Sequence, residues 1–197
     1  IFDGLDLSGI NLSFKNLSHA SFQNADLSNA NLELSEFKHC NFFGAKFFNT
    51  KLDSTHFDDC DFSFASFRMS NLVSIWIEHC SFKHMRFENC KMDRALFNYC
   101  KFNRVLFSGN LMNFSNWSDS IFYEPCTFYG SMILDICMNR IKGIKNIEIN
   151  KCIVRDIKNP VSDRSILYDI CKREYIHYIY CRIKAFFFGQ SSLEYWE

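Results

Sequence analysis

Large apolar residues recur at every fifth position along most of this 197-residue chain. The series runs from Phe2 to Phe122 in steps of five, and Phe, Leu, Ile, Met or Trp occupies each of its 25 positions. An amphipathic helix would repeat every third or fourth residue and a half-buried strand every second, so neither explains the spacing. A period of five predicts a chain that turns a corner every five residues and buries its interior by stacking coils, which is a solenoid.

A second pattern accompanies these repeat centres. Two residues before most centres the side chain is small, as at Ala25, Ala30, Cys40 and Thr50, and the remaining positions are rich in Asn, Asp, Ser and Lys. We therefore expect the centres and the small residues to point inward and the polar residues to face solvent.

The repeat resembles that of the pentapeptide-repeat proteins, whose pattern is A(D/N)LXX. The segment ADLSNANLELS at 25–35 matches it closely, and CDFSFASF at 60–67 and CSFKHMRFENCKM at 80–92 follow a Phe- and Cys-rich variant. The resemblance implies an all-β solenoid, namely a right-handed quadrilateral parallel β-helix with four pentads per coil.

The pattern divides the chain into three segments. We expect a regular pentapeptide-repeat β-helix over 1–124, a degenerate continuation over 125–159, and a C-terminal helical cap and tail over 160–197. Pro125 lacks a backbone donor, so we expect a bulge there, after which the pattern resumes one residue late at Phe128, Ile133 and Met138. A second slip places Ile144, Ile149 and Val154 at centres, with Ile147 and Cys152 as their inward partners.

The C-terminal segment changes period and predicts a helix over 162–188. Ser162 is a suitable N-cap, and Gly189 is a suitable stop. The helix would cover the unpaired strand edge at the end of the solenoid. Two alternatives are a homodimer formed through the aromatic run Tyr175–Phe188 and, less favoured, attachment to a membrane surface.

Composition and charge exclude several classes of protein. The 22 basic residues balance the 22 acidic ones, so no overall field favours nucleic acid, and we expect no direct nucleic-acid binding. The chain contains no apolar run long enough for a membrane span and no signal peptide. Because it begins inside the repeat and without Met, we expect it to be a fragment of a longer protein.

Ten cysteines could indicate disulfides, but their placement argues against this. Cys40, Cys60, Cys80 and Cys100 recur once every four pentads, so they stack in one column, at a separation and angle unsuited to disulfides or tetrahedral zinc. We expect these four and Cys90 to be buried as small apolar side chains, and all ten cysteines to be reduced and metal-free. This predicts a reducing compartment, either the bacterial cytoplasm or, for a secreted effector, the host cytosol.

The histidines do not predict an enzyme. His19, His39 and His79 share an outward column with Asp59, Tyr99 and Asp119, where acid–base or metal chemistry is conceivable. The column is open to water and has no nucleophile, and the chain carries no phosphate loop, HExxH or GxSxG motif. We expect no catalytic residues, no metal site and no cofactor.

Binding to a protein remains, and the resemblance implies two alternatives. One is a protein-binding scaffold similar to the β-helix of secreted bacterial effectors. The other is a mimic of duplex DNA that binds DNA gyrase or topoisomerase IV and confers quinolone or toxin resistance, which needs a strongly negative rod. Residues 1–61 carry nine acidic and four basic residues, whereas residues 62–125 carry five acidic and seven basic ones, so we prefer the scaffold.

One group of outward apolar residues is not required by the repeat. Phe43 and Phe48 each follow an inward Phe, Phe64 lies one coil above Gly44, and Met69 lies one coil above Asn49. We expect the Phe64 ring to lie across Gly44 toward Phe43, with Phe48 and Met69 extending the same region. Phe43, Phe48, Phe64 and Met69 are the predicted surface for a protein partner. The alternative is that these rings only cover a corner of the solenoid, or lie under a segment that precedes this chain.

Overall fold

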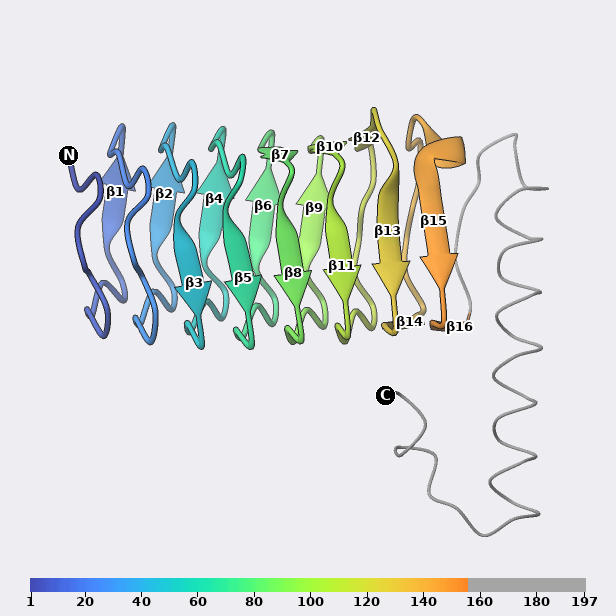
Figure 1. Cartoon of the computed structure of the whole chain (residues 1–197), viewed down its shortest axis with the longest axis horizontal. Helices are drawn as coiled ribbons and strands as arrows, with labels where there is room; N and C mark the ends of the chain where they lie inside the picture. Colours follow the sequence, from blue (N-terminus) through green and yellow to red (C-terminus); the bar gives the residue numbers. More distant parts are fainter. Residues whose placement is uncertain (156–197) are drawn as a thin grey trace, which may run out of the picture.

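The structure is a computed structural model and describes residues 1–155. Figure 1 shows a rod of stacked coils in which every paired strand is parallel to its neighbours. Along one face, Asn11 is linked through successive pairings to Ile153 in seven steps. Each step spans four pentads until Leu111 and is one residue longer after it. The predicted parallel β-solenoid is therefore confirmed.

Each coil contributes one short segment to each of four faces, three of which carry most of the strands. The five-stranded face consists, in spatial order, of β1 (Asn16–Ser18), β2 (Glu36–Lys38), β4 (His56–Asp58), β6 (Trp76–Glu78) and β9 (Leu96–Asn98). The three-stranded face consists of β12 (Ile121–Phe122), β10 (Lys101–Asn103) and β7 (Ser81–Lys83). The six-stranded face consists of β15 (Ile147–Asn150), β13 (Cys126–Tyr129), β11 (Leu106–Ser108), β8 (Arg86–Glu88), β5 (Ser66–Arg68) and β3 (Lys46–Phe48).

The remaining face is two-stranded, with β14 (Met132–Leu134) and β16 (Ile153–Arg155), and isolated bridges extend it toward the N-terminus. The chain visits the faces in a fixed order, as β6, β7 and β8 show before Lys91 bridges Asn71 and β9 begins the next coil. The five-stranded face therefore lies opposite the six-stranded face, and the three-stranded face lies opposite the two-stranded one.

The core is built from columns of identical or similar side chains. Phe42, Phe62, Phe82 and Phe102 are at most 1 % exposed, and successive rings in this column stack with centroids 5.0, 5.4 and 5.0 Å apart. Small residues two positions before the centres, such as Ala45 and Thr50, are buried beside them. The inward register read from the five-residue period is therefore confirmed.

Two single-residue insertions change the coil length near the C-terminal end of the described chain. Phe107 pairs with Phe128, and Phe128 pairs with Ile149, so each of these coils exceeds four pentads by one residue. Burial confirms the inward positions expected after the first slip, which are Phe128, Ile133 and Met138, and those of Ile147, Cys152 and Val154 after the second. Ile149 is partly buried against the core.

The placement of Ile144 at a repeat centre was wrong. Ile121 pairs with Lys142, and the second extra residue is taken up in the 3₁₀ turn η1 (Ile144–Asn146). Ile144 lies in this turn and packs only partly against the core. The Asn146 side-chain amide donates hydrogen bonds to the carbonyls of Phe122 at 2.7 Å and Tyr123 at 2.9 Å, so a side chain satisfies acceptors that backbone pairing satisfies elsewhere.

The residue two positions after almost every centre turns the corner with a positive φ; Glu124, before Pro125, is an exception. Between the three-stranded and six-stranded faces the corner residues are Gly44, Phe64, His84 and Arg104, with φ of 66°, 61°, 52° and 52°. This conformation costs an ordinary residue about 1 kcal/mol. The backbone N–H of Phe64 nevertheless donates to the Lys83 carbonyl at 2.7 Å, so the ladder continues through the corner and holds the side chain outward.

The predicted boundary at 159/160, the helical cap over 160–197, the helix over 162–188 and the dimer-forming run Tyr175–Phe188 lie outside the described residues. Within residues 1–155, the structure contains no helix long and apolar enough to cross a membrane.

Candidate binding surface

The structure brings two of the four predicted surface residues into contact. Phe43 lies at the end of its segment of the three-stranded face, and Phe64 turns the corner one coil later. Their ring centroids are 5.2 Å apart, with an angle of 48° between the ring planes. Phe64 is 50 % exposed and Phe43 is half-buried. The expected contact between these two rings is therefore present in the structure.

Gly44 occupies the corner below Phe64. A Cβ atom at Gly44 would overlap the Asn24 side-chain oxygen, and its φ of 66° also favours glycine. The Asn24 amide thus fills the space that a side chain at Gly44 would need. Gly44 therefore packs closely against Asn24 of the preceding coil, and the Phe43–Phe64 contact lies toward the following coil.

Phe48 and Met69 lie at the other edge of the six-stranded face, because each follows a centre of that face rather than of the three-stranded one. The Phe48 ring is 40 % exposed, and the Arg68 guanidinium carbon lies 5.9 Å from its centroid. Met69 is 54 % exposed and lines a shallow hollow of about 490 Å³ together with Asn49 and Lys51. The four predicted residues therefore form two groups across one face.

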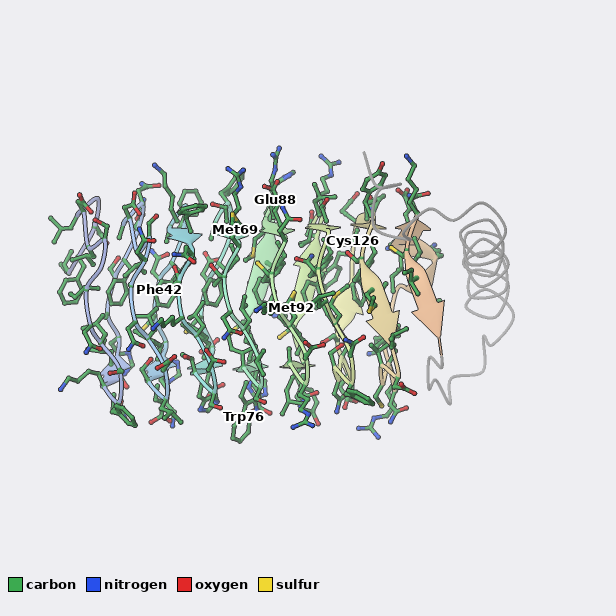
Figure 2. All side chains as sticks on the ribbon, turned by 90° about the horizontal axis from the view of Figure 1, so that it is seen from below. Phe42, Met69, Trp76, Glu88, Met92 and Cys126 are labelled. Atoms are coloured by element: carbon green, nitrogen blue, oxygen red, sulfur yellow. The ribbon has the colours of Figure 1, made fainter. Side chains whose placement is uncertain are left out.

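Figure 2 shows this arrangement of the faces directly. Met69 and Glu88, which belong to the six-stranded face and its edge, lie toward one side of the rod. Trp76 projects from the opposite side, where the five-stranded face lies, and Phe42 and Met92 lie inside. The Trp76 ring stacks on His56 with centroids 4.4 Å apart.

A third ring, which the sequence analysis did not select, continues the first group. His84 is the next corner residue after Phe64, and its ring stacks on Phe64 at 5.1 Å with an angle of 28° between the ring planes. We call Phe43, Phe64 and His84 the aromatic corner. The spacing of one coil from Phe64 to His84 is a signal in the sequence for this contact, since residues 20 apart stack in one column.

Exposed cations border the aromatic corner, and these were also missed. Lys83 lies directly before the corner residue His84, Lys46 and Arg86 are the first outward residues after the corner in their coils, and Arg104 is the next corner residue. All four side chains are exposed. We call these four residues the basic rim.

The predicted column of histidines is present, but its members pair rather than converge. His19 stacks on His39 at 4.9 Å, and His39 Nδ1 lies 2.9 Å from the Asp59 carboxylate. His79 Nδ1 turns instead to Asp58, at 2.9 Å. Within residues 1–155, no three His, Cys, Asp or Glu side chains are grouped so that they could hold a metal ion.

The other two predicted members of this column behave in the same way. The Tyr99 ring stacks on His79 at 5.3 Å. Both Asp119 carboxylate oxygens accept hydrogen bonds from the Arg140 guanidinium, at 2.6 Å each. The Arg140 hydrogen bonds lower the pKa of Asp119. This column is therefore a ladder of neighbouring pairs along one corner.

The buried thiols bond to the backbone. Cys60 donates to the Phe37 carbonyl at 3.4 Å, and Cys100 donates to the Ile77 carbonyl at 3.5 Å. Burial raises the pKa of Cys90 to about 12 and that of Cys126 to about 11. Because the thiolate is the form that attacks electrophiles and binds metals, these sulfurs are placed for packing rather than chemistry. Cys171 and Cys181 lie outside the described residues.

With this geometry in place, comparison with protein-family models identifies the repeat. A model described as "Pentapeptide repeats" matches eight copies of the repeat, over residues 1–38 and 40–74. These residues are pentapeptide repeats. A comparison with curated protein sequences found no match.

Several solved structures of pentapeptide-repeat proteins are similar to this chain. A trypsin-treated form of QnrB1, a plasmid-mediated fluoroquinolone resistance protein, is 19 % identical, with 84 % of this chain and 94 % of that chain covered and a TM-score of 0.48. HetL, which is involved in heterocyst differentiation regulation in the cyanobacterium Nostoc sp. strain PCC 7120, is 14 % identical, with 80 % and 91 % covered and a TM-score of 0.26. A pentapeptide-repeat protein from the Arabidopsis thaliana thylakoid lumen is 20 % identical, with 60 % and 69 % covered and a TM-score of 0.32.

Proposed function

We propose that this protein is a non-enzymatic scaffold that binds another protein through the Phe43–Phe64 side of the rod. The observation that carries the proposal is the contact between the exposed Phe64 ring and the half-buried Phe43 ring at a corner otherwise lined by polar residues and glycine. Aromatic side chains are enriched among the residues that contribute most to protein interfaces. Phe48 and Met69 supply a second apolar contact at the far edge of the six-stranded face.

The rigidity of the rod also supports a scaffold. Backbone pairing of successive coils fixes the corner residues, so a partner would meet rings that are already ordered. A surface that is ordered before binding loses less side-chain entropy on binding. The proposal excludes catalysis because the thiols considered above are buried, with raised pKa values where these are resolved, and because His39 and His79 each contact a single carboxylate.

Mimicry of DNA is less well supported by the charge distribution. A mimic needs carboxylates whose charge is uncompensated. On the five-stranded face and its edge, Glu36 lies 2.6 Å from Lys38 Nζ, and Asp119 forms the two hydrogen bonds to Arg140 described above. These ion pairs within the chain reduce the negative charge that is available to bind a topoisomerase.

The test compares two double variants that remove the same number of aromatic rings. Phe43→Ser with Phe64→Ser should abolish capture of protein partners from a host-cell lysate. Phe14→Ser with Phe114→Ser is the matched control, because Phe14 and Phe114 are 74 % and 60 % exposed on a different corner. The control should leave the captured proteins unchanged, and neither pair should shift the thermal midpoint by more than a few degrees.

Three results would contradict the proposal. If the Phe43/Phe64 variant captured the same proteins as the unmodified chain, these rings would have a structural role only. A collapse in the thermal stability of this variant would lead to the same conclusion. Inhibition of gyrase supercoiling by the unmodified chain would instead support the DNA mimic.

A further inference from the structure

We propose that the aromatic corner and the basic rim together bind an acidic segment of the partner protein that also carries large apolar side chains. This inference rests on the proposed function and specifies the chemistry of the partner. It depends on three observations, namely the charge of two neighbouring faces, the packing of the three rings, and the pairing of the backbone along the rod.

Cations are in excess on the faces that meet at the aromatic corner. Between residues 41 and 104, the three-stranded face, the six-stranded face and the corner between them carry two carboxylates, Asp61 and Glu88. Over the same range these surfaces carry six cationic side chains, which are Lys46, Arg68, Lys83, Arg86, Lys101 and Arg104. A partner that contacts the rings must therefore approach through a positive potential.

Few of these cations are neutralised within the chain. Lys46 and Lys83 form no ion pair with any residue in 1–155, whereas Lys38 on the opposite face lies 2.6 Å from Glu36. Arg86 and Arg104 reach Glu88 and Glu124 only at 3.8 Å, at exposed positions. The basic rim thus retains charge for a partner, and an acidic segment would supply the missing counter-charges.

The rings favour a protein segment over single-stranded nucleic acid. Phe64 has Phe43 in the coil below and His84 in the coil above, with both centroids within 5.2 Å of its own. Sequence-independent binding of single strands relies on open ring faces on which bases stack. Here His84 stacks on one face of the Phe64 ring and Phe43 packs against the ring at an angle of 48°, so Phe64 is not an open platform for a base. The exposed part of the ring suits contact with aliphatic or aromatic side chains.

The backbone restricts how the segment can bind. Successive coils pair on every face, so the sides of the rod offer no free strand edge for a partner to extend. Recognition must therefore use side chains. From the coil of Phe43 to that of Arg104 there are three coil steps, or about 14 Å, which an extended segment spans with about four or five residues.

The test uses a synthetic peptide of about ten residues that repeats Glu-Glu-Leu, long enough to cover the corner. It is titrated into the full ¹⁵N-labelled chain at about 50 mM salt, where surface charges are weakly screened, and amide shifts report both the site and the Kd. We expect shifts at the coils carrying Phe43, Phe64 and His84. Peptides with Gln for Glu or Ser for Leu should bind at least about tenfold more weakly.

Charge-reversal variants locate the binding site. Lys83→Glu with Arg86→Glu should raise the Kd for the acidic peptide at least about tenfold. Lys15→Glu with Arg94→Glu is the matched control, because it makes the same change of charge at exposed positions by the corner between the two-stranded and five-stranded faces. The control should change the Kd by less than about twofold beyond the screened effect of total charge.

Several outcomes would overturn the inference. These are the absence of shifts at saturating peptide, equal effects of the two charge-reversal variants, and tighter binding of a ten-nucleotide oligothymidylate than of the acidic peptide. The proposed function can fail separately. If Phe43→Ser with Phe64→Ser abolishes protein capture but Lys83→Glu with Arg86→Glu does not, the scaffold stands and the acidic partner is wrong. If the Phe variant leaves capture intact, the scaffold proposal itself fails.

Discussion

Replacing Phe62 with alanine tests whether the columns of inward phenylalanines hold the rod together. The Phe62 ring is fully buried and stacks between Phe42 and Phe82, with centroids 5.0 and 5.4 Å away. It also meets Phe57 edge-on at 5.1 Å and Phe67 at 5.7 Å. Truncation removes all of these contacts at once, and the paired backbone on every side limits how far the coils can collapse into the space.

The expected cost follows from this environment. Buried phenylalanine-to-alanine changes cost about 3–5 kcal/mol, and the poor ability of this site to relax places Phe62 in the upper part of that range. Phe2→Ala provides the comparison, because Phe2 belongs to the same column of inward residues as Phe62. Phe2 lies in the first coil and is half-buried, and among residues 1–155 its ring stacks on Phe22 alone, at 4.9 Å, so its removal should cost about 1 kcal/mol.

Urea unfolding measures the difference, followed by far-ultraviolet circular dichroism and by tryptophan fluorescence, to which the buried Trp117 contributes. Both signals must give the same midpoint, because repeat proteins can unfold in stages and a single free energy then has no meaning. Equal destabilisation by Phe62→Ala and Phe2→Ala would refute the packing argument. A loss below about 1.5 kcal/mol for Phe62→Ala would refute it as well.

Two further predictions concern groups with shifted pKa values. At pH 8 a thiol with the pKa of Cys90, about 12, is ionised in roughly one molecule in ten thousand. Iodoacetamide should therefore modify the half-exposed Cys137 well before Cys90, as peptide mass spectrometry would show. Equal rates of modification would contradict the burial argument. The Arg140 hydrogen bonds lower the pKa of Asp119 in the folded state. This pair therefore stabilises the fold above the unfolded pKa of the carboxyl and ceases to do so as the pH falls through its folded pKa. Arg140→Ala should raise the Asp119 pKa toward its ordinary value in an NMR titration, and an unchanged pKa would exclude this pairing in solution.

The sequence predicted the solenoid and most of its core because the constraint is local and strictly periodic. Every fifth side chain must point inward, so burial of residues such as Phe42 and Phe102 follows from spacing alone. The first insertion was also predictable, because Pro125 cannot donate to a ladder. The position of the second inserted residue could not be predicted, because Ile141, Ile144 and Ile147 are spaced by three. An inward isoleucine is available whether the extra residue is placed before or after Ile144.

The Phe43–Phe64 contact was predictable because residues 20 apart stack in one column, which puts Phe64 above Gly44 and diagonal to Phe43. Gly44 has no side chain that could keep the two rings apart. The position of Phe48 was not predictable, because deciding on which side of a face an outward residue lies requires the location of each corner. The hollow beside Met69 was also missed, since it depends on the shapes of Asn and Lys side chains in several columns.

Charge is where the sequence reading was least informative, for a geometric reason. Counting residues 1–61 against residues 62–125 averages over all four faces, and it indicates only a negative half followed by a mildly positive one. A partner contacts one side of a rod, not one half of its chain. Sorted by face, the acidic residues Glu36 and Asp58 lie beside Lys38 and His79 on the five-stranded side, whereas Lys46 and Lys83 have no ion-pair partner within residues 1–155. Because the fold fixes the inward residues and leaves outward ones free to vary, this segregation of charge around the Phe43–Phe64 contact is unexplained by folding and is the strongest reason to seek an acidic partner there.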